Sequence, residues 1–177
     1  EMAGKKLINQ ATAIMRVTHT LIGCFILASF VVMSVCAFYL LKNRHVDFAK
    51  RGFKIALVFG AISSLAQLAA GHTSAVMVAE NQPAKLAAFE GVYETTANAD
   101  LHLFGFPDDE EGRVKWGVAI PGMLSWLVDF DTDTVVQGLN DWKAENRPPT
   151  QIPFQMYHLM VGCGMYFIGI TMLGLFF

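Results

Sequence analysis

Three long apolar runs constrain the fold of this chain more than any other feature. They cover residues 11–41, 53–70 and 152–177, and the first is almost free of charge after Arg16. A helix needs about 20 mostly apolar residues to cross a bilayer, so each run predicts a transmembrane helix. A soluble bundle of buried helices is the alternative, but runs of this length would be hard to keep soluble when only 16% of residues are charged. We therefore predict an all-α membrane protein with three transmembrane helices.

Charge predicts the orientation of these helices. The stretch 71–151 contains thirteen acidic residues and five basic ones, whereas the short loop at 42–52 is basic. Basic residues in short loops favour the cytoplasmic side of the membrane. We therefore expect 42–52 to be cytoplasmic, and both 1–10 and the long, partly helical loop 71–151 to be extracytoplasmic. The basic residues of the short loop and its edge are Lys42, Arg44, Lys50, Arg51 and Lys54.

The loop segment ENQPAKLAAFEGVYETT carries a dense set of polar groups. Asn81 is a suitable helix cap, Pro83 suits a first helical turn, and good helix formers follow. Lys85 could hold an amphiphilic substrate at the membrane surface. Glu90 could accept a proton from it, with Glu94 one turn further along as an alternative. The competing interpretation is an ordinary solvated helix face.

Two other loop features have simpler expected roles. The segment RVKWGVAIPGMLSWLV is apolar, with two tryptophans and a proline, and predicts a stretch lying in the membrane interface. His72 and His102 are expected near the surface, in solvated positions.

A histidine and a methionine lie at matching places in two predicted spans. His19 and Met160 are each about eight residues in, which corresponds to about 12 Å of helix. Such a pair can supply both axial ligands of a low-spin haem. Alternatively, the histidine bonds a neighbouring helix and the methionine packs. His158 is a rival ligand, but it diverges from Met160 by about 200° around the helix, so both cannot face one iron.

Several motifs resemble one family of membrane enzymes. They are VTHT around His19, FAKRGFKIA, KLAAFEGVYET, FGFPDDEE and FQMYHLMVGCG. Their kind and order are similar to the central to C-terminal part of subunit I of the cytochrome bd quinol oxidases. The resemblance implies that 71–151 is the short form of the loop called the Q-loop in that family.

The resemblance also implies roles for individual residues. His19 and Met160 match the axial ligands of the family's low-spin haem b. Lys85 and Glu90 match loop residues implicated in quinol binding and oxidation. His158 falls where many members have arginine, which implies contact with a haem propionate. The segment GHTS departs from the family's GDES pattern, so a carboxylate at position 72 is lost.

The implied function is quinol oxidation in a bacterial or archaeal cytoplasmic (inner) membrane. Ubiquinol or menaquinol would give electrons to the low-spin haem b within a larger respiratory complex of several subunits. The high-spin haem b and haem d are expected on parts absent here, so this chain alone should not reduce oxygen. The alternative is a haem-containing or structural subunit of another respiratory complex, without its own quinol site. The net charge of −2 and the acidic loop argue against nucleic acid as a partner.

Overall fold

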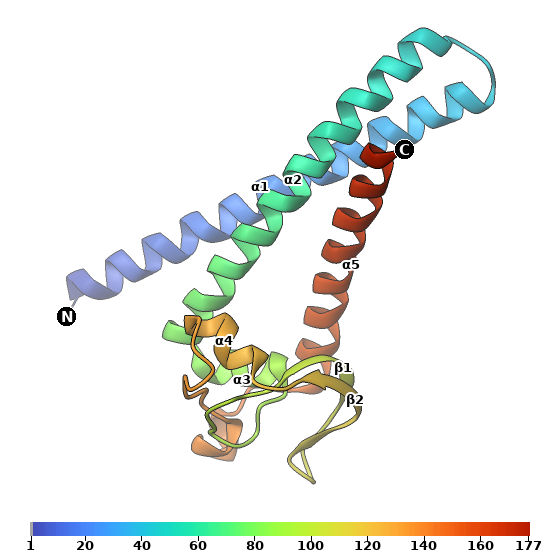
Figure 1. The fold of residues 1–177 in the computed structure, drawn as a ribbon. Helices are drawn as coiled ribbons and strands as arrows, with labels where there is room; N and C mark the ends of the chain where they lie inside the picture. The colour runs from blue at the N-terminus through green and yellow to red at the C-terminus, as the bar shows by residue number, and fades with distance from the viewer. Residues whose placement is uncertain (1) are drawn as a thin grey trace. The chain divides into compact units, whose positions relative to one another are not determined.

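The computed structural model describes the backbone of residues 2–177 and the side chains of residues 12–177. The chain forms two compact units, which are described separately (Figure 1). The helical unit comprises the chain up to Gly71 together with Cys163–Phe177. The loop unit comprises His72–Gly162.

Three long helices carry the apolar runs. They are α1 (Met2–Leu41), α2 (Val46–Asn81) and α5 (Gln151–Phe176). Each includes a stretch that is long and apolar enough to cross a membrane, so the prediction of three membrane-spanning helices is confirmed. The helices extend beyond the apolar runs. In particular, α2 begins at Val46, so the basic loop predicted at 42–52 is a turn of residues 42–45 followed by a basic first part of the helix.

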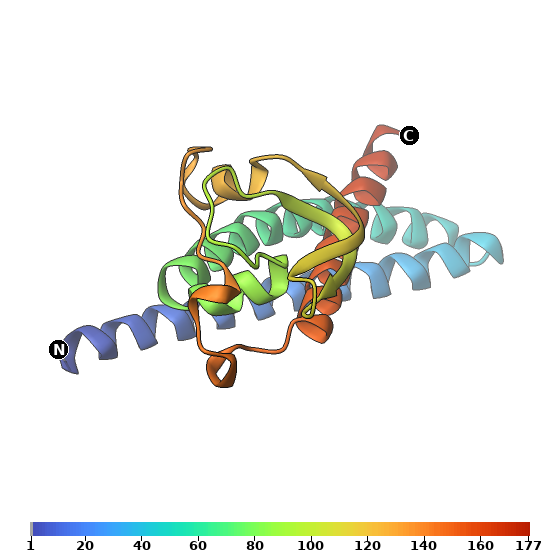
Figure 2. The same ribbon diagram turned by 90° about the horizontal axis from the view of Figure 1, so that it is seen from below.

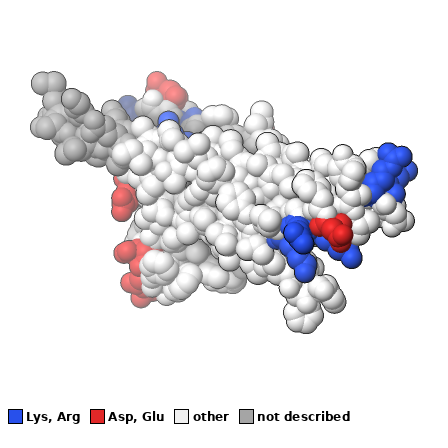
Figure 3. Space-filling model, turned by 90° about the horizontal axis from the view of Figure 1, so that it is seen from above, with Lys and Arg blue, Asp and Glu red and all other residues white. Residues whose placement is uncertain are grey.

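The turn between α1 and α2 is tight and basic. The backbone N–H groups of Lys42 and Arg44 donate to carbonyls of Phe38 and Tyr39, at 3.1 and 3.0 Å. These bonds satisfy carbonyl groups that the end of a helix leaves without partners. Figure 3 shows Lys and Arg side chains gathered at this end of the two helices, while most of the remaining visible surface is uncharged.

Small side chains allow α1 and α2 to approach closely. A Cβ atom on Gly60 would lie 3.1 Å from Cβ of Ser29, and one on Gly52 would lie 2.8 Å from Sγ of Cys36. Helices in membranes pack mainly through such close contacts, because lipid is as apolar as the side chains. Within the same unit, the rings of Phe30 and Phe167 lie 4.8 Å apart and join α1 to the second half of α5.

The loop unit has its own core, around which short elements fold (Figure 2). The elements are α3 (Pro83–Glu90), β1 (Leu101–Asp108), β2 (Arg113–Ile120), α4 (Met123–Asp129) and two 3-10 turns at Leu139–Asp141 and Ala144–Asn146. The buried residues of this core are Leu86, Ala87, Ala88, Phe89, Val92, Tyr93, Ala99, Leu124, Val136 and Leu139.

The chain is mostly helical, as predicted, but its partly helical loop also contains a β-hairpin that the sequence did not predict. Strands β1 and β2 pair antiparallel, from Leu101 opposite Ile120 to Asp108 opposite Arg113. The segment predicted to lie in the interface is therefore β2 followed by α4. Strand-forming Val, Trp and Ile dominate its first half, and the turn before α4 contains Gly122 in the left-handed region, at φ 67°.

The start of α3 also differs from the prediction. Pro83 occupies the first turn, as expected. Asn81, however, does not cap α3, because α2 continues through it and its side-chain amide donates to the carbonyl of Met77 at 2.9 Å. Gln82 takes the cap position, without a side-chain capping bond.

Candidate functional site

The end of helix α3 places Glu90 against the start of α5. The helix stops at Gly91, which has φ 71°, a conformation that favours glycine. There is also no room for a side chain at this position. A Cβ atom on Gly91 would lie 2.6 Å from Cγ2 of Val114 and 3.1 Å from Cε2 of Phe154. Glycine therefore lets the α3 terminus pack directly on β2 and α5, with Glu90 inside the contact.

The Glu90 side chain is buried in this contact. Glu90 is 1% exposed. Burial raises the pKa of its carboxyl to about 8, although a hydrogen bond from the Tyr157 hydroxyl opposes the rise. Burial disfavours the charged carboxylate because the interior solvates it poorly. Oxygen Oε2 is buried and has no hydrogen-bond partner among the described residues. Glu90 is thus a buried acid with one oxygen that lacks a partner among the described residues, and burial brings its pKa to about 8.

Aromatic packing holds Tyr157 beside this carboxyl. The Tyr157 ring stacks on Phe89, with centroids 4.3 Å apart and planes 28° apart. One turn earlier on α5, Phe154 is fully buried and its ring contacts Gly91. The residues that flank Glu90 in sequence are therefore both packed on α5.

One face of α5 is hydrogen-bonded to the backbone of β1. Gln151 Nε2 donates to the Pro107 carbonyl at 2.6 Å, and Gln155 Nε2 donates to the Gly105 carbonyl at 2.7 Å. A turn further on, His158 Nε2 lies 2.7 Å from the carbonyl oxygen of His102. The spacing of 151, 155 and 158 puts all three on one side of the helix. The start of α5 is therefore fixed to the β-hairpin.

His102 also belongs to this cluster. Its Nδ1 lies 3.1 Å from the backbone carbonyl oxygen of Glu90. Burial lowers the pKa of His102, and its bond to the Glu90 carbonyl opposes that effect. The expectation of a solvated surface position for His102 was therefore wrong. His72, the other histidine expected there, packs its ring 5.6 Å from that of Phe130.

The two nitrogens of His158 both face backbone carbonyls. Nδ1 lies 2.8 Å from the Phe154 oxygen, and Nε2 bonds the His102 oxygen. A metal ligand needs a nitrogen lone pair directed at the metal. Neither nitrogen offers one in this arrangement, which favours Met160 over His158 as an axial ligand. Met160 itself is 52% exposed.

Lys85 and Glu94 do not share the buried environment of Glu90. Both are exposed, and Glu94 Oε1 accepts a hydrogen bond from Asn140 Nδ2 at 2.6 Å. The expectation that Glu94 lies one helical turn beyond Glu90 was wrong, because α3 ends at Glu90. Lys85 and Glu90 occupy different faces of α3, one toward solvent and one toward the core.

His19 lies in the helical unit and is half-buried. Its Nδ1 is buried without a hydrogen-bond partner among the described residues. A Cβ atom on Gly71 would lie 3.7 Å from His19 Cε1, so this glycine leaves space beside the ring. Two other buried polar atoms of this unit also lack partners in the described part of the chain, Ser64 Oγ and Gln67 Oε1.

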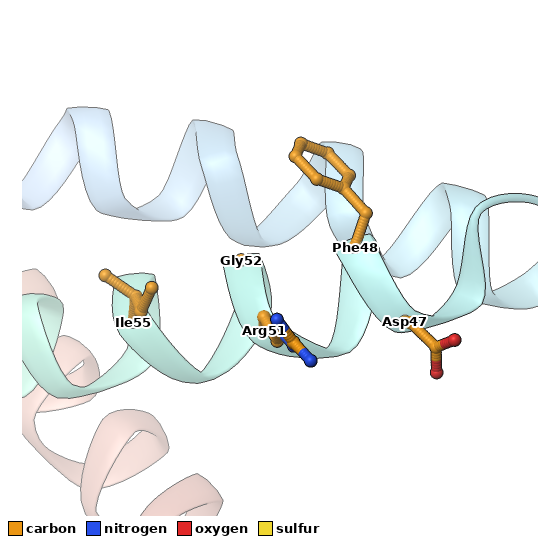
Figure 4. A pocket seen from close by; sticks show the side chains of 5 residues that line it. All are labelled: Asp47, Phe48, Arg51, Gly52 and Ile55. Carbon is orange, nitrogen blue, oxygen red and sulfur yellow. The ribbon is translucent and has the colours of Figure 1, made fainter.

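A surface pocket lies elsewhere, near the start of α2 (Figure 4). Its lining residues are Asp47, Phe48, Arg51, Gly52 and Ile55. Their spacing puts them on one face of a single helix. None of the residues predicted to bind substrate or cofactor lines this pocket.

Sequence reasoning missed two members of the Glu90 cluster, Tyr157 and His102. Tyr157 stands in FQMYHLM, next to the candidate ligands His158 and Met160. A tyrosine at the start of an apolar run was a usable signal, because a buried Tyr hydroxyl normally finds a hydrogen-bond partner. His102 gave no such signal, since its position depends on how the β-hairpin folds.

Comparison with known proteins agrees with the motif resemblance. The family described as "Cytochrome bd terminal oxidase subunit I" matches residues 4–177. The "Cytochrome bd-II ubiquinol oxidase subunit 1" of Escherichia coli (strain K12) is 33% identical over 147 residues, covering 82% of this chain and 29% of the relative. A Bacillus subtilis (strain 168) protein, provisionally named a cytochrome bd menaquinol oxidase subunit I, is 38% identical over 160 residues, covering 88% of this chain and 36% of the relative.

A solved structure shows the same fold. The bd oxidase from Geobacillus thermodenitrificans matches with a TM-score of 0.81 and 32% identity, over 90% of this chain and 36% of the matched chain. The chain thus spans about a third of the length of these relatives. The narrower expectation of a match to the central to C-terminal part of the subunit is not supported by these comparisons, and we withdraw it. Because the match extends over residues 4–177, the chain belongs to the cytochrome bd terminal oxidase subunit I family.

Proposed function

We propose that this chain forms the quinol-oxidising, haem-b-binding part of a cytochrome bd-type terminal oxidase in a bacterial membrane. It would act with the other subunits of a larger complex. Family membership and the names of the relatives, which include ubiquinol and menaquinol oxidases, support the reaction class. The observation that carries the proposal is Glu90, a buried acid with a pKa near neutrality and one oxygen without a partner.

The chemistry of quinol matches this site. Oxidation of a quinol releases two protons and two electrons, so a base must accept protons from its hydroxyl groups. A general base works best when its pKa lies near the working pH, as that of Glu90 does. Lys85, exposed on the same short helix, would attract the quinol oxygen from the outer side of the membrane. Glu94 is the less favourable proton acceptor because it is exposed to solvent and its carboxylate is already bonded to Asn140.

The residues for a haem also fit what the structure shows. His19 has a buried ring nitrogen without a partner among the described residues, and Gly71 leaves room beside its ring. An unpaired polar group in a membrane helix is costly and points to a functional role. We propose His19 and Met160 as the axial ligands of a low-spin haem b. His158, two residues before Met160, faces the backbone carbonyls of Phe154 and His102 instead. When bound, such a haem supplies one-electron transfer at a potential that a methionine ligand raises.

The test of the proton-accepting role is Glu90→Gln in the complete oxidase. The variant keeps the size of the side chain but cannot take up a proton. We expect quinol-driven haem reduction to slow by about 10²–10⁴-fold, while the haem spectrum stays unchanged. Glu110→Gln is the matched control, because Glu110 is an exposed glutamate of the β1–β2 turn. Wild-type rates for Glu90→Gln across a full quinol titration would remove the quinol site and favour a structural or haem-only subunit.

A separate variant tests the haem ligands. Met160→Leu conserves volume but removes the thioether. We expect a lower haem potential or conversion to high spin, measured by redox titration and optical spectra. An unchanged low-spin spectrum and potential would exclude Met160 and return His158 as the ligand.

A further inference from the structure

Tyr157 contacts both Glu90 and the residue before it, which points to a specific role. Its hydroxyl is the hydrogen-bond donor to the Glu90 carboxyl, and its ring stacks on Phe89, the preceding residue. The ring also meets His158 edge to face, with centroids 5.5 Å apart and planes 83° apart. Packing on both neighbours restricts the rotation of the tyrosine side chain. The hydroxyl is therefore held in one place relative to the end of α3.

The two oxygens of the Glu90 carboxyl differ because of this contact. The carboxyl receives the tyrosine bond, while Oε2 is buried without a partner among the described residues. Buried polar atoms are nearly always hydrogen-bonded, so each exception requires an explanation. A substrate hydroxyl that donates to Oε2 would supply the missing partner.

We propose that Tyr157 is a positioning residue, which holds the Glu90 carboxyl by one oxygen and leaves Oε2 free to receive the hydroxyl proton of quinol. This inference rests on the proposed function, since it assigns the second contact of the same carboxyl. In the step itself, the O–H bond of quinol breaks and an O–H bond forms at Oε2. Tyr157 keeps its own proton throughout and donates a hydrogen bond to the carboxyl in both states.

The hydrogen bond also determines when Glu90 can act as a base. Burial raises the pKa of Glu90 and the Tyr157 hydroxyl lowers it, because a donor stabilises the charged carboxylate. The other titratable groups of the cluster act less directly. His102 on β1 bonds the Glu90 backbone carbonyl, and His158 on α5 bonds backbone carbonyls only. Lys85 on α3 and Glu94 beyond it are exposed.

Removal of the hydroxyl should therefore shift the pH dependence of the reaction. A hydrogen bond to a charged group contributes enough to move a pKa by about one unit. In Tyr157→Phe, the acidic limb of the rate profile should move to higher pH by about one unit. The rate on that limb should fall about tenfold, and the difference from the wild type should shrink at alkaline pH.

The experiment measures quinol-driven haem reduction against pH in the complete oxidase. Tyr157→Phe is compared with Tyr166→Phe, the same change on the same helix at an exposed ring. The wild type and Tyr166→Phe should share one profile, and optical spectra should show intact haem in all three proteins. A profile for Tyr157→Phe that coincides with the wild type would overturn the inference. If Glu90→Gln is still slow in that case, the proposed function stands without the role assigned to Tyr157.

Infrared spectroscopy gives a second measurement that does not depend on turnover. The carbonyl band of protonated Glu90 is identified by its loss in Glu90→Gln. In Tyr157→Phe this band should move to higher wavenumber, because the carboxyl has lost a hydrogen bond. An unmoved band would contradict the contact itself, whether or not the variant is active.

Discussion

Among the described residues, the loop unit buries a cluster of ten residues, whereas the cluster of the helical unit has three, Met33, Ala56 and Leu57. In the helical unit, Phe38 is 57% exposed and Leu41 is 83% exposed, as are many side chains along α1 and α2. In the loop unit, Phe154 and Leu139 are almost completely buried, although Phe106 and Trp116 of the β-hairpin are exposed. The first pattern suits a surface covered by lipid, where an exposed apolar side chain costs nothing. The second is that of a domain which must form its core in water.

Unsatisfied polar atoms distinguish the two units as well. Among the described residues, the buried side-chain atoms without a partner are His19 Nδ1, Ser64 Oγ and Gln67 Oε1 in the helical unit, and Glu90 Oε2 in the loop unit. Other buried polar side chains of the loop unit are hydrogen-bonded, such as Ser125, whose Oγ accepts from the Ala99 N–H. The single exception among the described side chains of this unit lies in the residue proposed to accept a proton. A buried polar atom without a hydrogen-bond partner is therefore a more specific sign of a functional residue in the loop unit than in the helical unit.

The largest expected difference concerns the side of the membrane on which each region lies. Cysteine is placed at Glu110 in the β1–β2 turn or at Arg44 in the α1–α2 turn, in a chain whose three native cysteines are replaced. We expect a membrane-impermeant reagent to label Glu110→Cys in intact cells and to miss Arg44→Cys, because basic short loops stay inside. Permeabilised cells, in which both should react, provide the control. The opposite labelling pattern would invert the topology and move the quinol site to the cytoplasmic side.

A core truncation tests whether the loop unit has a water-type core. Phe154→Ala removes a fully buried ring and should cost about 3–5 kcal/mol of stability. Phe38→Ala removes an exposed ring from α1 and should cost far less. Limited proteolysis of the loop in purified oxidase measures the difference. Equal resistance in the two variants would show that Phe154 is not a core residue.

Sequence patterns predicted the helical unit well because its physics is local. Each span is a continuous run of apolar residues, and a helix is the only structure that satisfies its backbone in lipid. The ends were predicted less well. Helix α2 includes Lys50, Arg51 and Lys54, because charged residues remain good helix formers outside the lipid.

The loop unit was harder to predict because its contacts join distant residues. The sequence singled out Glu90 and placed Lys85 on the same helix. It could not reveal that Tyr157 would meet Glu90, since 67 positions separate them and the β-hairpin determines their approach. The expectation that Glu94 lies one helical turn beyond Glu90 was wrong because Gly91 takes a left-handed conformation and ends the helix.

Two glycine substitutions, one in each unit, compare how tightly the units are packed, and their expected effects on stability are smaller. Gly91→Ala adds a Cβ atom at a positive φ and 2.6 Å from Val114, which should destabilise the loop unit by about 2–3 kcal/mol. Gly164→Ala adds the same atom in α5, where no described atom lies within 4 Å, and should be neutral or slightly stabilising. Thermal denaturation of the purified oxidase, followed by protease sensitivity of the loop, measures both. A neutral Gly91→Ala would mean that the α3–α5 contact is looser than described.

The smallest predicted effect is a pH dependence confined to the loop unit. Glu90 has its pKa raised from 4.5 to about 8 in the folded loop, so the folded state binds more protons than the unfolded state between these values. Stability is therefore fully present below pH 4.5 and falls as pH rises through about 8. Between pH 7 and 8 the loss should be about 1 kcal/mol. His102 has a pKa lowered from 6.5, so its effect on stability changes mainly below pH 7 and adds only a small slope in this interval. Amide hydrogen exchange in α3, corrected for its intrinsic pH dependence, measures the loss.

Glu90→Gln should abolish this loss of stability, and the Glu110→Gln control should retain it. If the wild type and Glu90→Gln have the same slope, then Glu90 is not a buried neutral acid, and both the proton-accepting role and the role of Tyr157 would lose their physical basis.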